Sequence, residues 1–181
     1  MVEAVIEAIR VNVINDNHVV VLKEVDGPRV VPIWITNEVA NSIALVLQGA
    51  DVPRPLTHDL LRSVIYEMGG TVSRVVVNDL KDSIFHALIE IDLNGRRIQI
   101  DSRSSDAIAL AVRTNSPIYV EDHVIDQAGF TMQLESPAET TEPEETPSPS
   151  QQLDPVETER LMVFREFVNN LDLDDPKRES E

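Results

Sequence analysis

The chain has 181 residues, no cysteine and a formal net charge of −17. This length allows one domain with a full hydrophobic core and an appendage. The absence of cysteine excludes a disulfide framework, a thiolate metal site and a cysteine nucleophile. No apolar run approaches the roughly 20 residues of a membrane span, and the N-terminus lacks the basic start of a signal peptide. We therefore expect a cytoplasmic protein that makes no membrane contact.

The negative charge is concentrated towards the C-terminus. Residues 1–134 carry 11 Lys and Arg against 18 Asp and Glu, a net −7, whereas residues 135–181 carry 4 against 14, a net −10. Neither part shows the basic balance that is typical of a nucleic-acid binder. Contact with a polyanion would need local arginines, a metal ion or an oligomeric groove.

The first half of the chain is predicted to form three strands and two helices. Apolar patterning predicts strands over 3–14, 19–22 and 30–35, the last two forming a hairpin. A helix over about 38–48 follows, and Thr57 is a good N-cap for the second helix. We expect Trp34 to be a packed strand residue.

The second half repeats this order of elements. Strands are predicted over 72–77, 85–93 and 96–100, followed by a helix over about 104–114 and a short strand over 118–120. Strands outnumber helices and neighbouring strands are joined by hairpins. The sequence therefore predicts an α+β fold, a mixed or antiparallel sheet with helices packed on it.

Two segments of the chain share one layout. Each reads as a strand, a polar turn and a helix that leads into Ile-Ala-Leu, at Ile43–Leu45 and again at Ile108–Leu110. We interpret this as a duplicated hairpin–helix unit. Two similar amphipathic helices that arose independently are the alternative.

The composition changes after the predicted domain, which we place at residues 1–130. Residues 131–153 are rich in Pro, Glu, Thr and Ser and predict a disordered acidic linker. Residues 154–171 predict a short amphipathic helix that docks on its own domain or on a neighbouring subunit. Residues 172–181 are expected to form a frayed tail.

The densest polar segment is Asp101–Ala111, where the predicted strand ends in Asp101 and a serine-rich turn leads into a helix. Asp106 lies in the first turn of that helix, and Arg103 lies between the two acids. Asp101 and Asp106 are candidate catalytic residues and candidate ligands for Mg²⁺ or Mn²⁺. Arg103 and Ser105 are candidate substrate contacts, because a guanidinium binds phosphate through two parallel hydrogen bonds. A helix cap braced by an ion pair is the alternative reading of the same residues.

A second candidate group lies before the helix that Thr57 caps. His58 is a candidate general acid or base, Asp59 a further catalytic carboxylate, and Arg54 a phosphate contact. The structural alternatives are a helix-dipole role for Asp59 and a packing role for His58. There is no glycine-rich phosphate loop, so no nucleotide or organic cofactor is expected. The residue types allow a Ser-His-Asp triad, but no Gly-x-Ser-x-Gly elbow supports one.

These segments resemble the bifunctional nuclease (BFN) domain family. Pro53–Leu61 (PRPLTHDLL) and Asp101–Ala111 (DSRSSDAIALA) are similar to its two signature segments, and Pro32–Leu45 to its first half. The resemblance spans about residues 3–128. It departs from the usual family pattern at Ser104, where proline is usual, and at Thr36, where glycine is usual.

The resemblance implies a bacterial nuclease that hydrolyses phosphodiester bonds of DNA and RNA with little sequence preference and with help from a divalent metal. The alternative is a non-catalytic oligomeric module for binding or assembly, in which the signature turns are helix caps. A sensor of a small anion is a third reading. A homo-oligomer is expected under the first two readings.

Overall fold

The computed structural model describes residues 1–12 and 17–131. The predicted C-terminal helix and tail lie outside these residues, as does all of the predicted linker except its first residue. Eight strands and four helices are present in the described residues, in the order β1 (Val2–Asn12), β2 (Asn17–Glu24), β3 (Arg29–Ile35), α1 (Asn37–Leu47), α2 (Thr57–Glu67), β4 (Gly70–Lys81), β5 (Ile84–Leu93), β6 (Arg96–Arg103), α3 (Ser104–Thr114), β7 (Ile118–Val120), α4 (Asp122–Ala128) and β8 (Phe130–Thr131).

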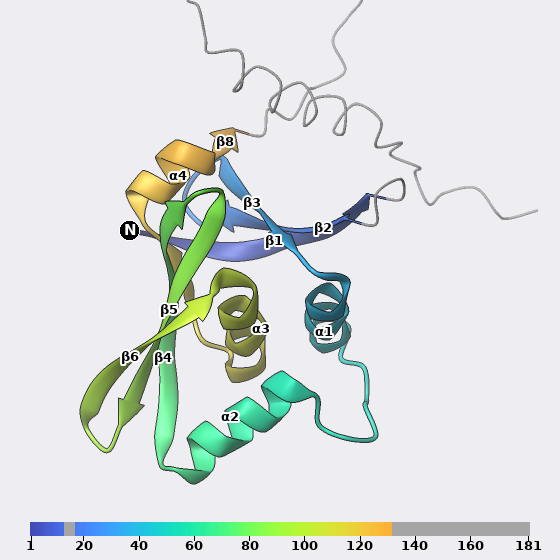
Figure 1. Cartoon of the computed structure of the whole chain (residues 1–181), viewed down its shortest axis with the longest axis vertical. Coiled ribbons are helices and arrows are strands. Elements are labelled where there is room, and N and C mark those ends of the chain that lie inside the picture. Colours follow the sequence, from blue (N-terminus) through green and yellow to red (C-terminus); the bar gives the residue numbers. More distant parts are fainter. Residues whose placement is uncertain (13–16, 132–181) are drawn as a thin grey trace, which may run out of the picture. The chain divides into compact units, whose positions relative to one another are not determined.

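All eight strands form one mixed sheet in the order β6-β5-β4-β7-β1-β2-β3-β8. Two antiparallel meanders, β1–β3 and β4–β6, are joined by the short strand β7, which pairs antiparallel with β1 and parallel with β4. Helices pack on the sheet (Figure 1), so the predicted α+β class is confirmed. The proposed duplication stays a prediction. None of the described helices is both long and apolar enough to cross a membrane.

Helix α3 is the centre of the core. Its five consecutive residues Ala107–Ala111 are buried, and they join one hydrophobic cluster with Leu22, Ile33 and Val75 from the sheet. Full burial of a leucine or isoleucine side chain contributes about 1.5–3 kcal/mol. The position of α3 is therefore fixed by packing, and the polar residues of its first turn are held in one place.

The junction before α3 differs from the predicted one. Strand β6 continues through Asp101 and Ser102 to Arg103, because β5 is long enough to pair with all three residues. The helix then begins at Ser104 with no turn between. The prediction that the strand ends at Asp101 in a serine-rich turn was therefore wrong.

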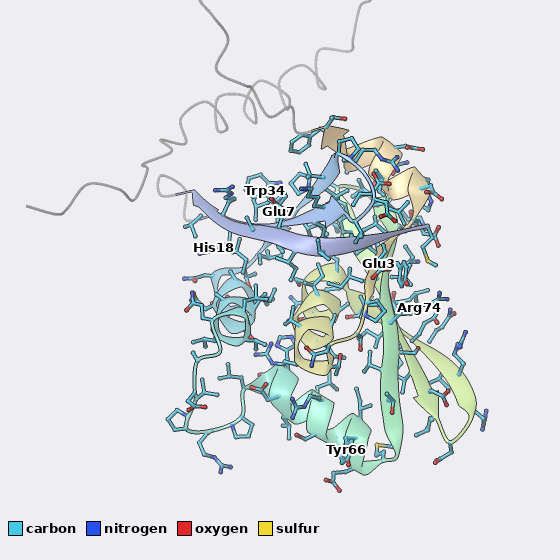
Figure 2. The ribbon with its side chains drawn as sticks, turned by 180° about the vertical axis from the view of Figure 1, so that it is seen from behind. Glu3, Glu7, His18, Trp34, Tyr66 and Arg74 are labelled. Carbon is cyan, nitrogen blue, oxygen red and sulfur yellow. The ribbon has the colours of Figure 1, made fainter. Side chains whose placement is uncertain are left out.

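Other differences concern ends and faces of elements. Helix α2 begins at Thr57 with Leu56 in the N-cap position, one residue before the predicted cap. Helix α4 and strand β8 were not predicted. The Trp34 side chain is 52% exposed rather than packed, and Figure 2 shows it on the side of the sheet away from α1.

Candidate functional site

Asp106 is the centre of a polar network that joins helices α1, α2 and α3. The Arg103 guanidinium donates to both of its carboxylate oxygens, from Nε to Oδ2 at 2.6 Å and from Nη2 to Oδ1 at 3.0 Å. Nε2 of His58, in the first turn of α2, lies 3.1 Å from Oδ1. Arg103 is three residues from Asp106, whereas His58 is 48 residues away and is brought there by the fold.

The carboxyl group of Asp106 is ionised at neutral pH. Partial burial would on its own raise the pKa of this carboxyl. The hydrogen bonds and charges of Arg103 and His58 outweigh the burial and lower the pKa below its ordinary value of 3.8. An ionised carboxylate only accepts hydrogen bonds, so Nε2 of His58 carries the proton that is shared with Asp106.

The other side of the His58 ring faces α1. Nδ1 lies 3.4 Å from Oγ of Ser42, and that oxygen accepts a hydrogen bond from Nη2 of Arg113 at 2.9 Å. Because arginine only donates, the Ser42 hydroxyl proton is free to point towards Nδ1. His58 and Ser42 are each only 8% exposed. The network therefore fixes the orientation of the His58 ring.

Arg113 ties the three helices together. Its side chain is 1% exposed, and its Nε donates to Oδ1 of Asp59 at 2.7 Å. Its two Nη atoms donate to the carbonyl oxygens of Ala109 and Ser42 at 2.9 and 3.0 Å. Every nitrogen of this buried guanidinium thus has an acceptor, as a buried charge requires.

The pKa of Asp59 is lowered in the same way. Burial alone would raise the pKa of this carboxyl. Hydrogen bonds from the Leu56 amide and from Arg113, with the charge of Arg113, lower it below 3.8. The Leu56 amide also belongs to the helix start, donating to Oδ2 of Asp59 at 2.9 Å. Asp59 therefore closes the first turn of α2 and anchors Arg113.

The structure separates the predicted site residues into two groups. Asp106 contacts both His58 and Arg103, and Asp59 joins this group through Arg113 and Ser42. Within the described part of the chain, the remaining three predicted residues make no hydrogen bond or ion pair with another side chain: Asp101 on β6, Arg54 on the exposed segment between α1 and α2, and Ser105 in the first turn of α3.

Two residues of the network, Ser42 and Arg113, were not predicted from the sequence. The one available signal was the position of Arg113, four residues after Ala109 and three after Leu110, both of which are buried on the core face of α3. A charged residue on an apolar stripe needs a partner in the interior. Ser42 carried no comparable signal, because serine is common on helices at positions without function.

The Ser42–His58–Asp106 series contains the residue types of a hydrolytic triad but not its working arrangement. Ser42 is buried and its oxygen accepts from Arg113, so it is closed to a substrate. The serine also lies on Nδ1 and the acid on Nε2, the reverse of the usual order. The network therefore orients a histidine and an aspartate rather than activating a serine.

The donor set does not fit a resident divalent cation in this arrangement. Both oxygens of Asp106 are already occupied by Arg103 and His58, and the arginine neutralises the carboxylate. No cluster of three or more His, Asp or Glu side chains suited to a metal occurs in residues 1–12 and 17–131.

Sequence comparison places this network within a known domain. The sequence model of the bifunctional nuclease domain matches residues 20–133, which include all three helices of the site. The chain belongs to the bifunctional nuclease domain family.

Relatives of this family member occur in bacteria and plants. A Mycobacterium tuberculosis protein described as uncharacterized is 37% identical over 177 residues, which cover 98% of this chain and 99% of the relative. Bifunctional nuclease 1 of Oryza sativa subsp. japonica is 25% identical over 128 residues. That match covers 68% of this chain but only 39% of the rice protein. An Oryza minuta protein described as a bifunctional nuclease matches to the same extent.

Proposed function

We propose that this protein is a nuclease that hydrolyses phosphodiester bonds of DNA and RNA at Asp106. The observation that carries the proposal is a partly exposed carboxylate paired with an exposed arginine and supported from behind by a buried histidine. Family membership and the plant relatives described as bifunctional nucleases support the choice of substrate.

Arg103 is suited to hold the phosphate. Its side chain is 68% exposed, and Asp106 engages only its Nε and Nη2. Nη1 and the second Nη2 proton are left to donate to a phosphate oxygen. Charge neutralisation of this kind stabilises the additional negative charge of a phosphoryl-transfer transition state.

Asp106 is suited to orient the attacking water and to accept its proton at Oδ2, which accepts one hydrogen bond where Oδ1 accepts two, because its side chain is 28% exposed beside Arg103. His58 acts as a positioning residue, since its ring is buried and both nitrogens are hydrogen-bonded. The bond from Nε2 keeps the Asp106 carboxylate in one orientation. This role replaces the general acid or base role that the sequence alone suggested for His58.

Four parts of the proposal are supported by the sequence and not by side-chain contacts in the structure. Arg54 and Ser105 are proposed as additional substrate contacts, and Asp101 as a second carboxylate near the reacting phosphate. Assistance by Mg²⁺ or Mn²⁺ is proposed from the family resemblance, although the side chains as arranged do not form a site for it.

Cleavage of labelled single-stranded RNA and duplex DNA tests the proposal. Wild type, Asp106→Asn and Glu38→Gln are purified in parallel and assayed with Mg²⁺, Mn²⁺ or EDTA. We expect Asp106→Asn to lower the cleavage rate by about 10²–10³-fold, as removal of one key electrostatic group does in other enzymes. Glu38, also a first-turn acid but on α1, serves as the matched control. Equal cutting by all three proteins would reject Asp106 as the active-site residue.

A non-catalytic assembly module is the second candidate, and one observation favours it. Helix α2 exposes Leu60 and Val64 one turn apart, and the exposed C-cap residue Met68 follows one turn later. Such an apolar stripe on a surface helix is typical of a subunit contact, so we propose a homo-oligomer under either function. Absence of cleavage by wild type, with a loss of stability in Asp106→Asn, would favour this candidate.

A further inference from the structure

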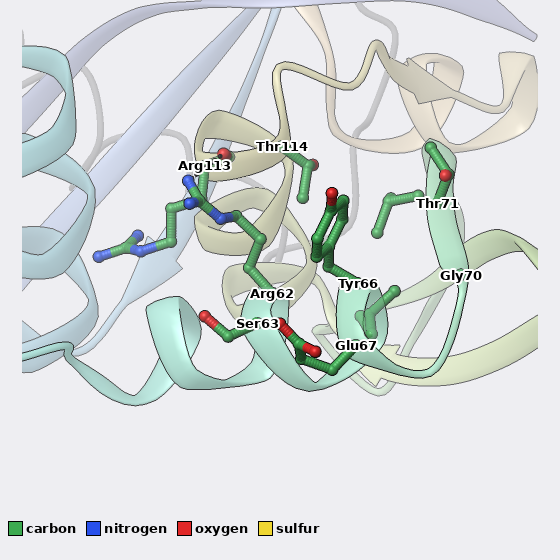
Figure 3. A pocket seen from close by; sticks show the side chains of 10 residues that line it. Arg62, Ser63, Tyr66, Glu67, Gly70, Thr71, Arg113 and Thr114 are labelled. Carbon is green, nitrogen blue, oxygen red and sulfur yellow. Dashed lines mark hydrogen bonds between the residues drawn. The ribbon is translucent and has the colours of Figure 1, made fainter.

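A pocket of about 380 Å³ lies next to the Asp106 network. It is formed by the second half of α2, the start of β4 and the end of α3 (Figure 3). This volume falls in the range of small-molecule sites. The polar side chains that line it outside the network are Arg62, Ser63, Tyr66, Glu67, Thr71 and Thr114.

Arg113 connects this pocket to the site. Its side chain holds Asp59 and Ser42, while its backbone oxygen accepts a hydrogen bond from Nη1 of Arg62 at 3.2 Å. Along α2, His58 lies in the first turn and Tyr66 lies eight residues later, a rise of roughly 12 Å. A ligand that occupies the pocket would therefore be within reach of a chain that is bound at Arg103.

Tyr66 gives the pocket a surface for stacking. Its side chain is 76% exposed, and its hydroxyl has no hydrogen-bond partner among the residues that the structure describes. Figure 3 shows the ring rising from α2 between Thr71 and Thr114. An aromatic ring so little used in packing is the kind of platform on which unpaired bases stack.

Arg62 supplies a donor for an anion. Only Nη1 is engaged, so within the described ranges Nε and Nη2 have no partner. This edge of a guanidinium matches the oxygens of a phosphate. The Glu67 carboxylate at the same pocket disfavours a second negative charge, and it offers an acceptor to the amino group of a base.

The net charge of the domain favours a binding site of this kind. Residues 1–134 carry a net −7, so long-range attraction cannot hold a polyanion here. Base stacking is largely independent of that charge and contributes about 1–3 kcal/mol per base. Stacking on the bases of the substrate can therefore supply affinity to an acidic nuclease that long-range attraction does not.

We propose that this pocket binds one unpaired nucleotide of the substrate, with its base stacked on Tyr66 and its phosphate on Arg62. The inference rests on the proposed nuclease function, and it adds a preference for single strands, because a paired base cannot reach the ring without unstacking.

The binding test uses the full chain carrying Asp106→Asn, so that the substrate stays intact. Affinity is measured for a labelled single-stranded RNA oligonucleotide and for adenosine monophosphate, with adenosine and inorganic phosphate as partial ligands. In this background we expect Tyr66→Ala to weaken binding of the oligonucleotide and the mononucleotide by about 5- to 100-fold. Tyr66→Phe keeps the ring and should bind like its parent.

Trp34→Ala is the matched control, because it removes an exposed aromatic that does not line the pocket. It should leave both affinities unchanged. Equal affinities for Tyr66→Ala and Tyr66→Phe would overturn the proposal.

Cleavage by the same variants without Asp106→Asn separates this proposal from the proposed function. If wild type cuts RNA and Tyr66→Ala leaves KM unchanged, the nuclease stands and the nucleotide subsite is wrong. If wild type does not cut but Tyr66→Ala abolishes binding of both ligands, the subsite stands and the nuclease is wrong.

Discussion

The N-termini of helices α1 and α3 are built alike but differ in what reaches them. Each helix follows a strand almost directly, and each has an acid in its first turn, Glu38 in α1 and Asp106 in α3. The pKa of Glu38 is lowered mainly by the backbone at the helix start and by the Thr36 hydroxyl. Asp106 receives His58 from a different helix. Local sequence places an acid at both helix starts, and a tertiary contact makes one of them a candidate site.

The largest effect is expected from replacing the residue that joins the three helices. Arg113→Met takes a buried cation from Asp59, Ser42 and Ala109, and loss of one partner of a buried pair costs about 3–5 kcal/mol. We expect the lower end, because Asp59 keeps some contact with water. Urea unfolding measures the effect. Arg29→Met, which breaks a more exposed ion pair with Glu24, should lower stability far less, because solvent screens that pair.

A smaller effect is expected from removing the contact that distinguishes Asp106. His58→Ala removes one hydrogen-bond partner each from Asp106 and Ser42, at a cost of about 1–3 kcal/mol. Loss of the hydrogen bond from His58 should also raise the pKa of Asp106. In a pH profile of cleavage, the loss of activity at acidic pH should then occur at a higher pH than in wild type. His58→Gln retains an amide donor and should restore part of both properties. An unshifted acidic limb in His58→Ala would contradict a role for His58 in holding Asp106.

Acid should weaken the network in a defined direction. Asp59 and Asp106 have lower pKa values in the folded protein than their ordinary value of 3.8. Groups of this kind stabilise the fold above the ordinary pKa, and the contribution is lost as pH falls through the folded values. Urea midpoints measured from neutral pH downward should therefore drop below pH 3.8. The drop should be shallower for the double variant Asp59→Asn/Asp106→Asn, and an equal slope would show that other carboxylates dominate.

The smallest effect is expected at the start of helix α1. Glu38→Gln removes an exposed acid that no other helix contacts in the described structure, so the free energy of unfolding should change the least of all the variants. The rate of cleavage should not change. A loss of activity as large as that of Asp106→Asn would contradict this distinction, because it would make the starts of helices α1 and α3 functionally equal.

Most of the fold could be read from the sequence because its signals are local. The spacing of Ala107, Ile108 and Ala111 predicted helix α3 with its observed bounds, and alternation predicted the meander strands. The junction at Asp101–Arg103 was misread because the length of β6 depends on its partner β5. Trp34 was misplaced because its exposure depends on which face of the sheet the helices cover.

Only the contacts between residues that are close in the sequence could be predicted for the site. Arg103 and Asp106 are three residues apart at a helix start, where such pairs form from sequence alone. The approach of His58 is a property of how α2 crosses α3. Ser42 and Arg113 have no local signature beyond a charge on an apolar stripe, because their partners come from other helices.

The three residues of β7 also decide when the two meanders become one sheet. Strands β1 and β4 meet only through Ile118–Val120, which pair with Val2–Ala4 on one side and with Val75–Val77 on the other. While the chain is being synthesised, each meander can form from near neighbours, but both keep an open edge until residue 120 has left the ribosome. Open strand edges pair with other chains. A nascent or truncated chain that stops before β7 is therefore expected to aggregate, even though all the candidate site residues have already been made.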